Sequence, residues 1–529
     1  MKKFYAFFIA IFTTLLLLPV FYMVFLGIAK PDTEFLRLVI NDPRYRNLFF
    51  NSLTIGFFTS VFSVVLGFPL AYAIARIKLP FRRVIENVFL IPLLIPSYFL
   101  AIAWVFLAGD NGIITNALRT LPGVNIAVSP LYSTWGVILI LTLSYFPLVT
   151  LLTLTGLRNI DLNLEKAGWL ATSRFRAFTG ISLPLILPYV LGSAILVFVL
   201  ALNNFDVPSI LLVNDIYPME IFYQFSVFYK PERAMLLALP LILTAFAAIF
   251  AWYLLFKNRS IITIGSGWRA PEYPENGRIA GFSAFIFAAL LMTVAVILPL
   301  AGLVAQARSV GAISGAFSLA YKEMLNSLII AFITTVLSIV FGIIIAHAIE
   351  RRTTRLKGPV LALLMVPLIV PGSAIGIGLI KMYNHGIFLW IYGTIFIVVL
   401  GLLARFIIIP VISISGAIKM MDPSLENAAA AHGAGYKRIL AKIIFPLTGQ
   451  AIIASAVLCF IFSLNELPVA IMVNPPGFNT ISVRIYSLFH FGQEQAVAVL
   501  CLIMTGVTVV LYAILMLLFK RKGNSGHGN

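Results

Sequence analysis

Long apolar runs recur along the whole chain and decide what it can fold into. Runs of spanning length lie near residues 4–29, 48–75, 85–107, 134–157, 184–205, 234–256, 280–305, 326–349, 359–380, 388–412, 447–467 and 496–519. A transmembrane helix needs about 20 mostly apolar residues. With 61% hydrophobic and 11% charged residues among 529, the chain has too little polar surface for a water-soluble fold. The sequence therefore predicts an all-α polytopic membrane protein with about twelve transmembrane helices.

Positive charges predict how these spans are oriented. The chain carries 37 Lys and Arg residues against 19 Asp and Glu. If the N-terminus is cytoplasmic, most of the cations fall in cytoplasmic segments, as the positive-inside rule requires. We therefore predict that both termini are cytoplasmic. The positive charge then reflects insertion in a lipid bilayer, and no nucleic-acid partner is expected.

The first apolar run has a second reading as a cleaved signal peptide, because basic residues precede it. However, it is longer than the apolar core of a signal peptide, which has about 7–15 residues. Its Leu18-Pro19 pair also recurs as Leu298-Pro299 in the seventh run, and a removed peptide would need no such counterpart. We therefore expect residues 4–29 to be retained as a span.

The second half of the chain repeats the first. At an offset of 275 residues, the aligned pairs include Asn51 with Asn326, Ser52 with Ser327, Gly67 with Gly342, Arg76 with Arg351, Pro92 with Pro367 and Pro96 with Pro371. The sequence predicts six-span repeats at 1–256 and 280–519, a cytoplasmic linker at 257–279 and a cytoplasmic tail at 520–529. Because six is even, the repeats should be parallel and related by a pseudo-twofold axis along the membrane normal. A transport pathway between them is the expected consequence.

Paired prolines interrupt the third span of each repeat. They are Pro92 and Pro96 in the first repeat and Pro367 and Pro371 in the second. A proline inside a helix frees a backbone carbonyl and kinks the helix. Two readings stay open, since these residues either set the packing geometry of a kinked helix or form a gate that lines the pathway.

The most distinctive residues lie in a cytoplasmic loop before the fifth span of each repeat. These loops cover residues 158–183 and 413–446. Both are predicted to fold as a short helix, a break and a second short helix. In the first loop Thr172 and Ser173 can cap the second short helix. In the second loop Asp422 can cap the first helix, and Gly433 and Gly435 can interrupt it.

These two loops resemble the cytoplasmic EAA loop of ABC importer permeases, in which Glu-Ala-Ala is followed by a Gly and later by a Pro. The matching residues are Glu165, Ala167 and Ala171 in the first loop and Glu426, Asn427, Ala429 and Gly433 in the second. Ala171 stands where the family has Gly, and either Glu426 or Asn427 takes the carboxylate position of the second copy. The resemblance implies ATPase-coupling helices, and we expect the Glu165 carboxylate to face a groove on the ATPase.

The resemblance also implies the partners of the chain. They are two copies of an ABC ATPase subunit and an extracytoplasmic solute-binding protein, which act with a multi-pass permease of the bacterial cytoplasmic (inner) membrane. The chain has no GxxxxGK[ST] phosphate-binding loop. ATP and Mg are therefore expected on the partner ATPase, and this chain is expected to bind no cofactor and to be no enzyme.

The fused twelve-span form is similar to ferric iron transport permeases, and so are the stretches 465–468, 475–480 and 483–486. Ferric iron prefers oxygen ligands. Candidate pathway residues, equivalent between the repeats, are Asn203, Asn204, Asp206, Asn465 and Glu466. They lie near the outer ends of spans, where a capping role is equally open. The histidines share no ligand spacing, so no firm metal site is predicted.

Other functions stay open as alternatives. Importers of thiamine, polyamines or phosphonates belong to the same class. An ion-coupled secondary transporter also uses parallel repeats, but chains of buried acidic residues are missing here. An intramembrane enzyme is not indicated, because the sequence shows neither HExxH nor an evident pair of nucleophile and base.

Overall fold

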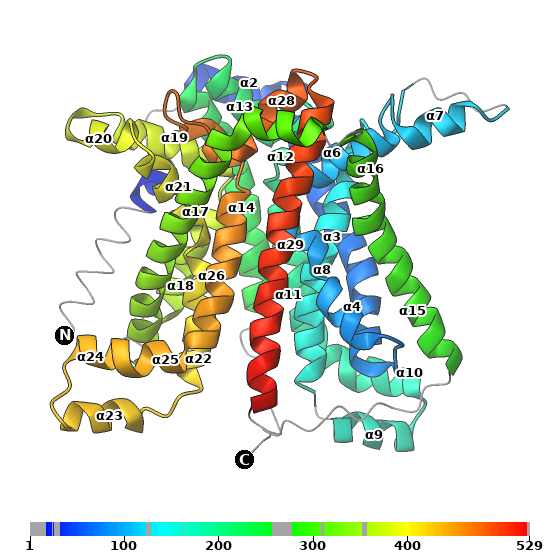
Figure 1. Cartoon of the computed structure of the whole chain (residues 1–529), viewed down its shortest axis with the longest axis vertical. Coiled ribbons are helices and arrows are strands. Elements are labelled where there is room, and N and C mark those ends of the chain that lie inside the picture. Colours follow the sequence, from blue (N-terminus) through cyan, green and yellow to red (C-terminus); the bar gives the residue numbers. More distant parts are fainter. Residues whose placement is uncertain are drawn as a thin grey trace. The chain divides into compact units, whose positions relative to one another are not determined.

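The computed structural model describes residues 17–23, 25, 32–122, 128–160, 162–256, 278–307, 311–351 and 357–525, which form helices and no strands (Figure 1). The first half contains α2 (Thr33–Asn41), α3 (Pro43–Arg76), α4 (Arg82–Val88), α5 (Ile91–Leu94), α6 (Ser97–Ala108), α7 (Ile113–Arg119), α8 (Thr134–Arg158), α9 (Leu162–Ala171), α10 (Arg174–Ala177), η1 (Phe178–Ser182), α11 (Leu183–Leu202), α12 (Asp206–Ile210), α13 (Tyr217–Ser226) and α14 (Pro231–Phe256). The second half contains α15 (Arg278–Met292), η2 (Thr293–Ile297), α16 (Leu298–Ala307), α17 (Gly311–Arg351), α18 (Lys357–Ile369), α19 (Gly372–Tyr383), η4 (Gly386–Phe388), α20 (Leu389–Tyr392), α21 (Phe396–Phe406), α22 (Ile408–Lys419), α23 (Ser424–Ala431), α24 (Tyr436–Ile439), η5 (Leu440–Ile444), α25 (Phe445–Leu447), α26 (Gly449–Leu464), α27 (Pro468–Val473), α28 (Ile481–His490) and α29 (Glu494–Ser525).

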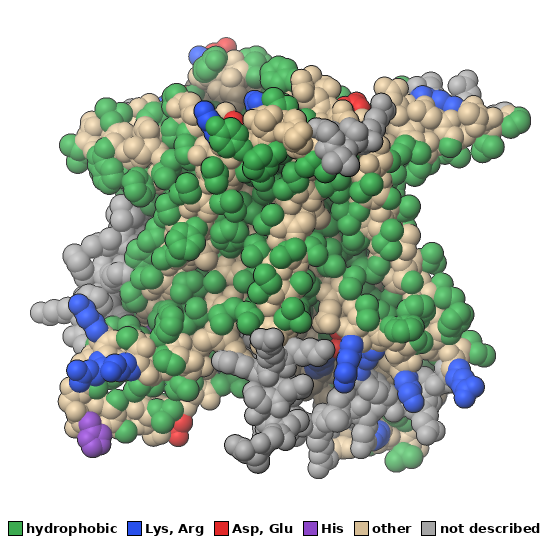
Figure 2. Space-filling model, in the orientation of Figure 1, with side chains coloured by type: hydrophobic (Ala, Val, Ile, Leu, Met, Phe, Trp, Pro, Cys, Tyr) green, Lys and Arg blue, Asp and Glu red, His purple; other side chains and the backbone are tan. Residues whose placement is uncertain are grey.

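Long apolar helices dominate the part of the chain that the structure describes. Eight are long and apolar enough to cross a membrane, and up to twelve spans result if each of four bent helix pairs counts as one. Hydrophobic side chains cover the visible sides of the helices (Figure 2). The prediction of an all-α polytopic membrane protein is therefore confirmed. Most of the predicted span 4–29, the linker residues 257–277 and the last residues 526–529 lie outside the described residues.

The helices gather in two compact units. One comprises residues 37–220 and 240–308, and the other comprises residues 1–36, 221–239 and 309–529. In the first unit α3 packs along α8 and α11, and in the second unit α17 packs along α22 and α26. Because α3 and α17 occupy the same place in the repeat, each unit is organised around the same helix.

Two repeated glycines explain how closely these central helices pack. A Cβ atom on Gly67 in α3 would lie 2.7 Å from the carbonyl oxygen of Phe146 and 2.8 Å from Cβ of Val149, both in α8. A Cβ atom on Gly342 in α17 would lie 2.9 Å from Cβ of Pro410 in α22. Both positions therefore require a residue without a side chain, which gives the repeated glycine a physical reason.

The first span of the second repeat packs in the unit built mainly from the first repeat. A Cβ atom on Gly302 of α16 would lie 2.6 Å from Cγ of Leu107 in α6. In the other unit, a Cβ atom on Gly378 of α19 would lie 2.6 Å from the carbonyl oxygen of Pro19. Since α6 and α19 are equivalent, the chain exchanges matching N-terminal segments between its two units.

The paired prolines break the third span of both repeats. Pro92 lies in the first turn of α5 and Pro96 directly precedes α6. Pro371 directly precedes α19, which is bent by 102° from α18, the helix that contains Pro367. Pro96 and Pro371 share one backbone conformation, with φ near −54° and −53° and ψ of 136°. The expected kink is therefore present, and the gate stays a prediction.

The close approach at Gly67 generates a stability test. We expect Gly67→Ala to lower the free energy of unfolding by about 1–3 kcal/mol, because the added methyl group overpacks the contact with α8. Gly506→Ala in α29 is the control, since its Cβ would meet nothing within 4 Å and Ala favours helix over Gly. Melting temperatures of both purified variants in detergent measure the effect, and equal values would contradict this account of the packing.

Candidate functional site

The two predicted loops fold as expected into a short helix, a break and a second short helix. The first loop contains α9 and α10, followed by the π-helical turn η1, and the second contains α23 and α24, followed by η5. Oγ of Ser173 accepts a hydrogen bond from the backbone N–H of Arg176 at 3.3 Å and so caps α10. Oδ1 of Asp422 accepts one from the N–H of Ser424 at 2.8 Å, at the start of α23. The predicted cap at Ser173 is confirmed, whereas the N-cap of α23 is Pro423 and Asp422 precedes it by one residue.

Gly433 ends α23 in a left-handed conformation with φ of +79°. The N–H of Gly433 donates to the carbonyl of Ala430, and the N–H of Ala434 donates to the carbonyl of Ala429, each at 3.0 Å. This pair of bonds is the Schellman arrangement, which favours glycine because other residues are strained at positive φ. A Cβ atom on Gly433 would meet nothing within 4 Å. The backbone angle, and not lack of space, therefore demands glycine.

Glu165 holds the first loop to the end of α3. Arg76 Nε lies 2.8 Å from Oε2 of Glu165, and Arg76 Nη2 lies 3.0 Å from Oε1. The same Nη2 donates to the carbonyl of Leu157 at 2.8 Å, while Oγ of Ser182 donates to Oε1 of Glu165 at 2.9 Å. Arg76 and Glu165 are only 5% and 4% exposed. We call Arg76, Glu165 and Ser182 the first clamp.

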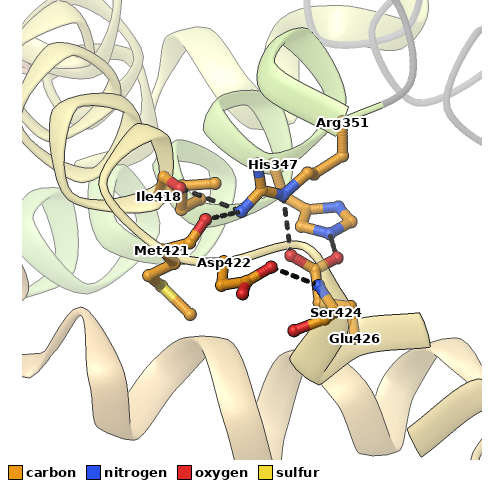
Figure 3. Close-up of polar contacts among 7 residues, drawn as sticks. All are labelled: His347, Arg351, Ile418, Met421, Asp422, Ser424 and Glu426. Carbon is orange, nitrogen blue, oxygen red and sulfur yellow. Dashed lines mark hydrogen bonds and ion pairs between the residues drawn. The ribbon is translucent and has the colours of Figure 1, made fainter. Parts of the chain in front are cut away.

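Glu426 holds the second loop to the end of α17 in the same way (Figure 3). Arg351 Nε lies 2.8 Å from Oε1 of Glu426, and His347 Nε2 lies 2.9 Å from Oε2. Arg351 Nη2 donates to the carbonyls of Ile418 and Met421 at 3.0 and 2.9 Å. Burial opposes ionisation of Glu426, but hydrogen bonds from His347 and Arg351 outweigh it and lower the pKa of the carboxyl. We call His347, Arg351 and Glu426 the second clamp.

The contacts of the two clamps indicate which residue of the second loop corresponds to the Glu165 carboxylate of the first loop. Arg351 is the repeat counterpart of Arg76, so its partner Glu426 corresponds to Glu165. Asn427, the other candidate, is exposed. The longer break around Gly433 accommodates the shift, because four residues separate α23 from α24 whereas two separate α9 from α10.

The expectation that Glu165 presents its charge to a partner is wrong. Its carboxylate is buried against Arg76, because an intramolecular guanidinium satisfies it on both oxygens. Ala167 and Ala171 of α9 are exposed, Ala429 is half-buried and Gly433 is exposed. The residues that sequence reasoning missed are Arg76, Arg351 and His347. The alignment of Arg76 with Arg351 in the repeat was the available signal.

The outward surface of both loops is apolar and basic. In the first loop Leu170 is 91% exposed and Phe175 is 76% exposed, beside Arg174 and Arg176. Met420, which directly precedes the second loop's short helices, is 88% exposed. Lys and Arg side chains gather at this end of the units in Figure 2. In the first loop these exposed apolar side chains lie beside basic residues on the side of the short helices that faces away from the unit.

The candidate pathway residues have structural contacts. Oδ1 of Asn204 accepts a hydrogen bond from the N–H of Val207 at 3.0 Å, and Oε1 of Glu466 accepts one from the N–H of Val469 at 3.2 Å. They therefore cap equivalent short helices. Glu466 Oε1 also lies 2.6 Å from Nη1 of Arg405.

The remaining candidates lie beside these caps. Nδ2 of Asn203 donates to the carbonyl of Val199 at 3.0 Å, Nδ2 of Asn465 lies 3.4 Å from Oγ1 of Thr508, and Asp206 begins α12. Among the described residues, no group of three or more His, Cys, Asp or Glu side chains is arranged to hold a metal. A role in the pathway stays a prediction for all five residues.

Duplicated repeats of apolar helices, each with a loop clamped at one end of its central helix, define a polytopic membrane protein with two equivalent loops. The chain belongs to the family of binding-protein-dependent transport system inner membrane components, whose family model matches residues 63–298 and 338–523. It is thus a multi-pass inner-membrane permease of a transport system that uses an ATPase and a solute-binding protein.

Relatives cover most of the chain at low identity. A Haemophilus influenzae protein named "Putative ferric transport system permease protein FbpB 1" is 24% identical over 83% of this chain and 71% of its own length. The ferric transport system permease protein FbpB of Actinobacillus pleuropneumoniae is 23% identical over 79% of this chain and 63% of its own length. A Salmonella paratyphi A protein named "Putative 2-aminoethylphosphonate transport system permease protein PhnV" is 27% identical over 40% of this chain and 79% of its own length.

The conformation of Gly433 generates a local test. We expect Gly433→Ala to destabilise the end of α23 by roughly 1–2 kcal/mol, because alanine is strained at positive φ. Hydrogen exchange of the backbone amides in residues 424–440 should then be roughly 5–30 times faster. Gly435→Ala is the matched control, since Gly435 has a φ of −69° that any residue adopts. Equal exchange in the two variants would contradict the role given to the backbone angle.

Proposed function

We propose that this protein is the transmembrane permease of an ATP-driven importer that carries ferric iron into the cytoplasm from an extracytoplasmic binding protein. The observation that carries the proposal is the pair of loops anchored by Arg76–Glu165 and Arg351–Glu426, one loop in each repeat. Each repeat presents an equivalent loop at the same end of its central helix. Two equivalent loops can bind two copies of one ATPase subunit. Both loops and both termini are then cytoplasmic.

The sequence offers this chain no means of hydrolysing ATP itself. It contains no phosphate-binding loop of the GxxxxGK[ST] type. We therefore place ATP and Mg on the partner ATPase and assign this chain no enzymatic activity and no cofactor. The free energy of ATP hydrolysis on the ATPase can reach the permease only through protein contacts. The loops must therefore bind the ATPase and also transmit its movement.

Iron is the substrate that the similarities favour. The two ferric transport permeases match about four-fifths of this chain, whereas the 2-aminoethylphosphonate permease matches 40% of it. Phosphonate import is the second candidate, because a 2-aminoethylphosphonate permease is 27% identical over 40% of this chain.

The exposed apolar residues of the loops are the contacts that we expect to enter the ATPase groove. Glu165 and Glu426 are occupied within the chain, so they are not available as contact residues. Leu170 and Met420 are the most exposed large apolar side chains of the two loop regions. Buried apolar anchors provide most of the affinity of protein interfaces, with charged residues such as Arg174 at the rim.

The docking assignment is tested by Leu170→Asp and Met420→Asp. Each change should weaken ATPase binding by at least about tenfold, because a charge replaces an apolar anchor. Copurification and affinity of the ATPase subunit with the detergent-solubilised permease measure the loss. Val128→Asp is the control, because Val128 is 66% exposed and precedes the start of α8, whereas the first loop follows the end of α8. Unchanged ATPase binding in both loop variants would remove these residues from the interface.

The substrate is tested by gene deletion followed by uptake measurements in iron-poor medium. We expect lower accumulation of radiolabelled ferric iron, restored by the gene on a plasmid, while uptake of thiamine, spermidine and 2-aminoethylphosphonate is unchanged. Normal iron accumulation together with lost uptake of one of the other solutes would reassign the importer to that solute.

A further inference from the structure

The helices α3 and α17 carry attachments at both ends, not only at the clamps. Near the end opposite the first clamp, Nδ2 of Asn51 donates to the carbonyl of Asp215 at 2.9 Å. Oγ of the neighbouring Ser52 accepts a hydrogen bond from the N–H of Tyr217, the first residue of α13, at 2.9 Å. The Asn-Ser pair therefore holds the start of α13 onto α3.

The second repeat has the same attachment. Nδ2 of Asn326 donates to the carbonyl of Asn479 at 3.1 Å. Oγ of Ser327 accepts from the N–H of Ile481, the first residue of α28, at 2.7 Å. Ser52 and Ser327 are each 2% exposed, so water cannot replace these bonds cheaply. The repeated Asn-Ser pair is thus a repeated structural joint.

In each repeat one continuous helix connects the joint to the clamp. Asn51 and Arg76 are 25 residues apart, as are Asn326 and Arg351. At about 1.5 Å per residue, either helix carries a displacement over about 37 Å. The Arg76–Glu165 pair is buried and the Arg351–Glu426 pair is partly buried, so removing one partner would leave a poorly solvated charge without its counter-charge. A loop therefore cannot shift independently of the helix end to which it is clamped.

We propose that α3 and α17 are levers, and that Arg76 and Arg351 are positioning residues that make each coupling loop move with its lever. The Asn-Ser joints then pass the movement to α13 and α28 at the far end, where a binding protein would dock. This inference rests on the proposed function, because it requires an ATPase to move the loops. It assigns transmission to four contacts, which are one clamp and one joint within each unit.

The lever is tested at the clamp in proteoliposomes that contain the permease, its ATPase subunits and the binding protein loaded with radiolabelled ferric iron. Arg76→Met and Glu165→Gln should each reduce iron transported per ATP hydrolysed by at least about tenfold, because the buried pair is broken. Arg76→Lys, which keeps the charge but loses the two-point contact, should fall between these variants and wild type. Arg76→Glu combined with Glu165→Arg should restore part of the ratio.

Two further variants separate transmission from general stability. Arg82→Met breaks the partly exposed Arg82–Glu86 pair of α4 and should leave the ratio unchanged. Ser52→Ala removes the buried one of the two hydrogen bonds of the joint at the other end of α3. It should lower stimulation of ATP hydrolysis by the binding protein, although the ATPase still copurifies. A merely structural clamp would lower the yield of folded protein without changing the ratio or this stimulation.

The outcomes distinguish the lever from the importer assignment. Suppose that wild type transports iron and that Arg76→Lys, Arg76→Met and Ser52→Ala keep the same iron transported per ATP and the same stimulation of ATP hydrolysis by the binding protein. The lever proposal is then wrong, while the proposed importer function is unaffected. If wild type binds no ATPase and moves no solute in its presence, the proposed function fails and the lever fails with it.

Discussion

An ion pair between an arginine and a glutamate, buried in the first repeat and partly buried in the second, holds a short-helix loop to the end of the central helix of each repeat. Removing two charges from water is costly, and the cost is offset only when both are well paired and hydrogen-bonded. Arg76 and Glu165 meet this condition through two contacts with each other and further bonds to Leu157 and Ser182. The same construction recurs around Arg351, so the position of each coupling loop follows from one electrostatic requirement.

The two repeats solve this requirement with different chemistry. Beside Arg351, the second clamp has an imidazole, His347, where the aligned residue of the first repeat is Tyr72. Likewise Glu466 pairs with Arg405, whereas its counterpart Asn204 is uncharged. In both cases the second repeat holds a side chain that can be charged near neutral pH where the first repeat holds a neutral one. The repeats are therefore equivalent in architecture, but their electrostatics differ at both the clamp and the cap.

Sequence patterns predicted the parts of the fold that depend on local chemistry. Apolar runs predicted the spans, the offset of 275 residues predicted equivalent helices, and Gly433 and Ser173 predicted the ends of short helices. These patterns could not predict which group each charged side chain contacts. A helical carboxylate such as Glu165 looks the same in sequence whether it faces water, a second protein or a buried guanidinium. The exchanged packing around Gly302 and Gly378 likewise depends on contacts between distant segments.

That exchange has a consequence for biosynthesis. Pro19 lies against α19, and α16 lies against α6, so each unit contains segments from both repeats. During translation, the unit around α3 stays incomplete until α16 has entered the membrane, and the N-terminal segment waits for α19 before it reaches its partner. The two halves therefore cannot mature one after the other as separate domains, and the peptide linkage between them keeps both exchanged segments at high local concentration.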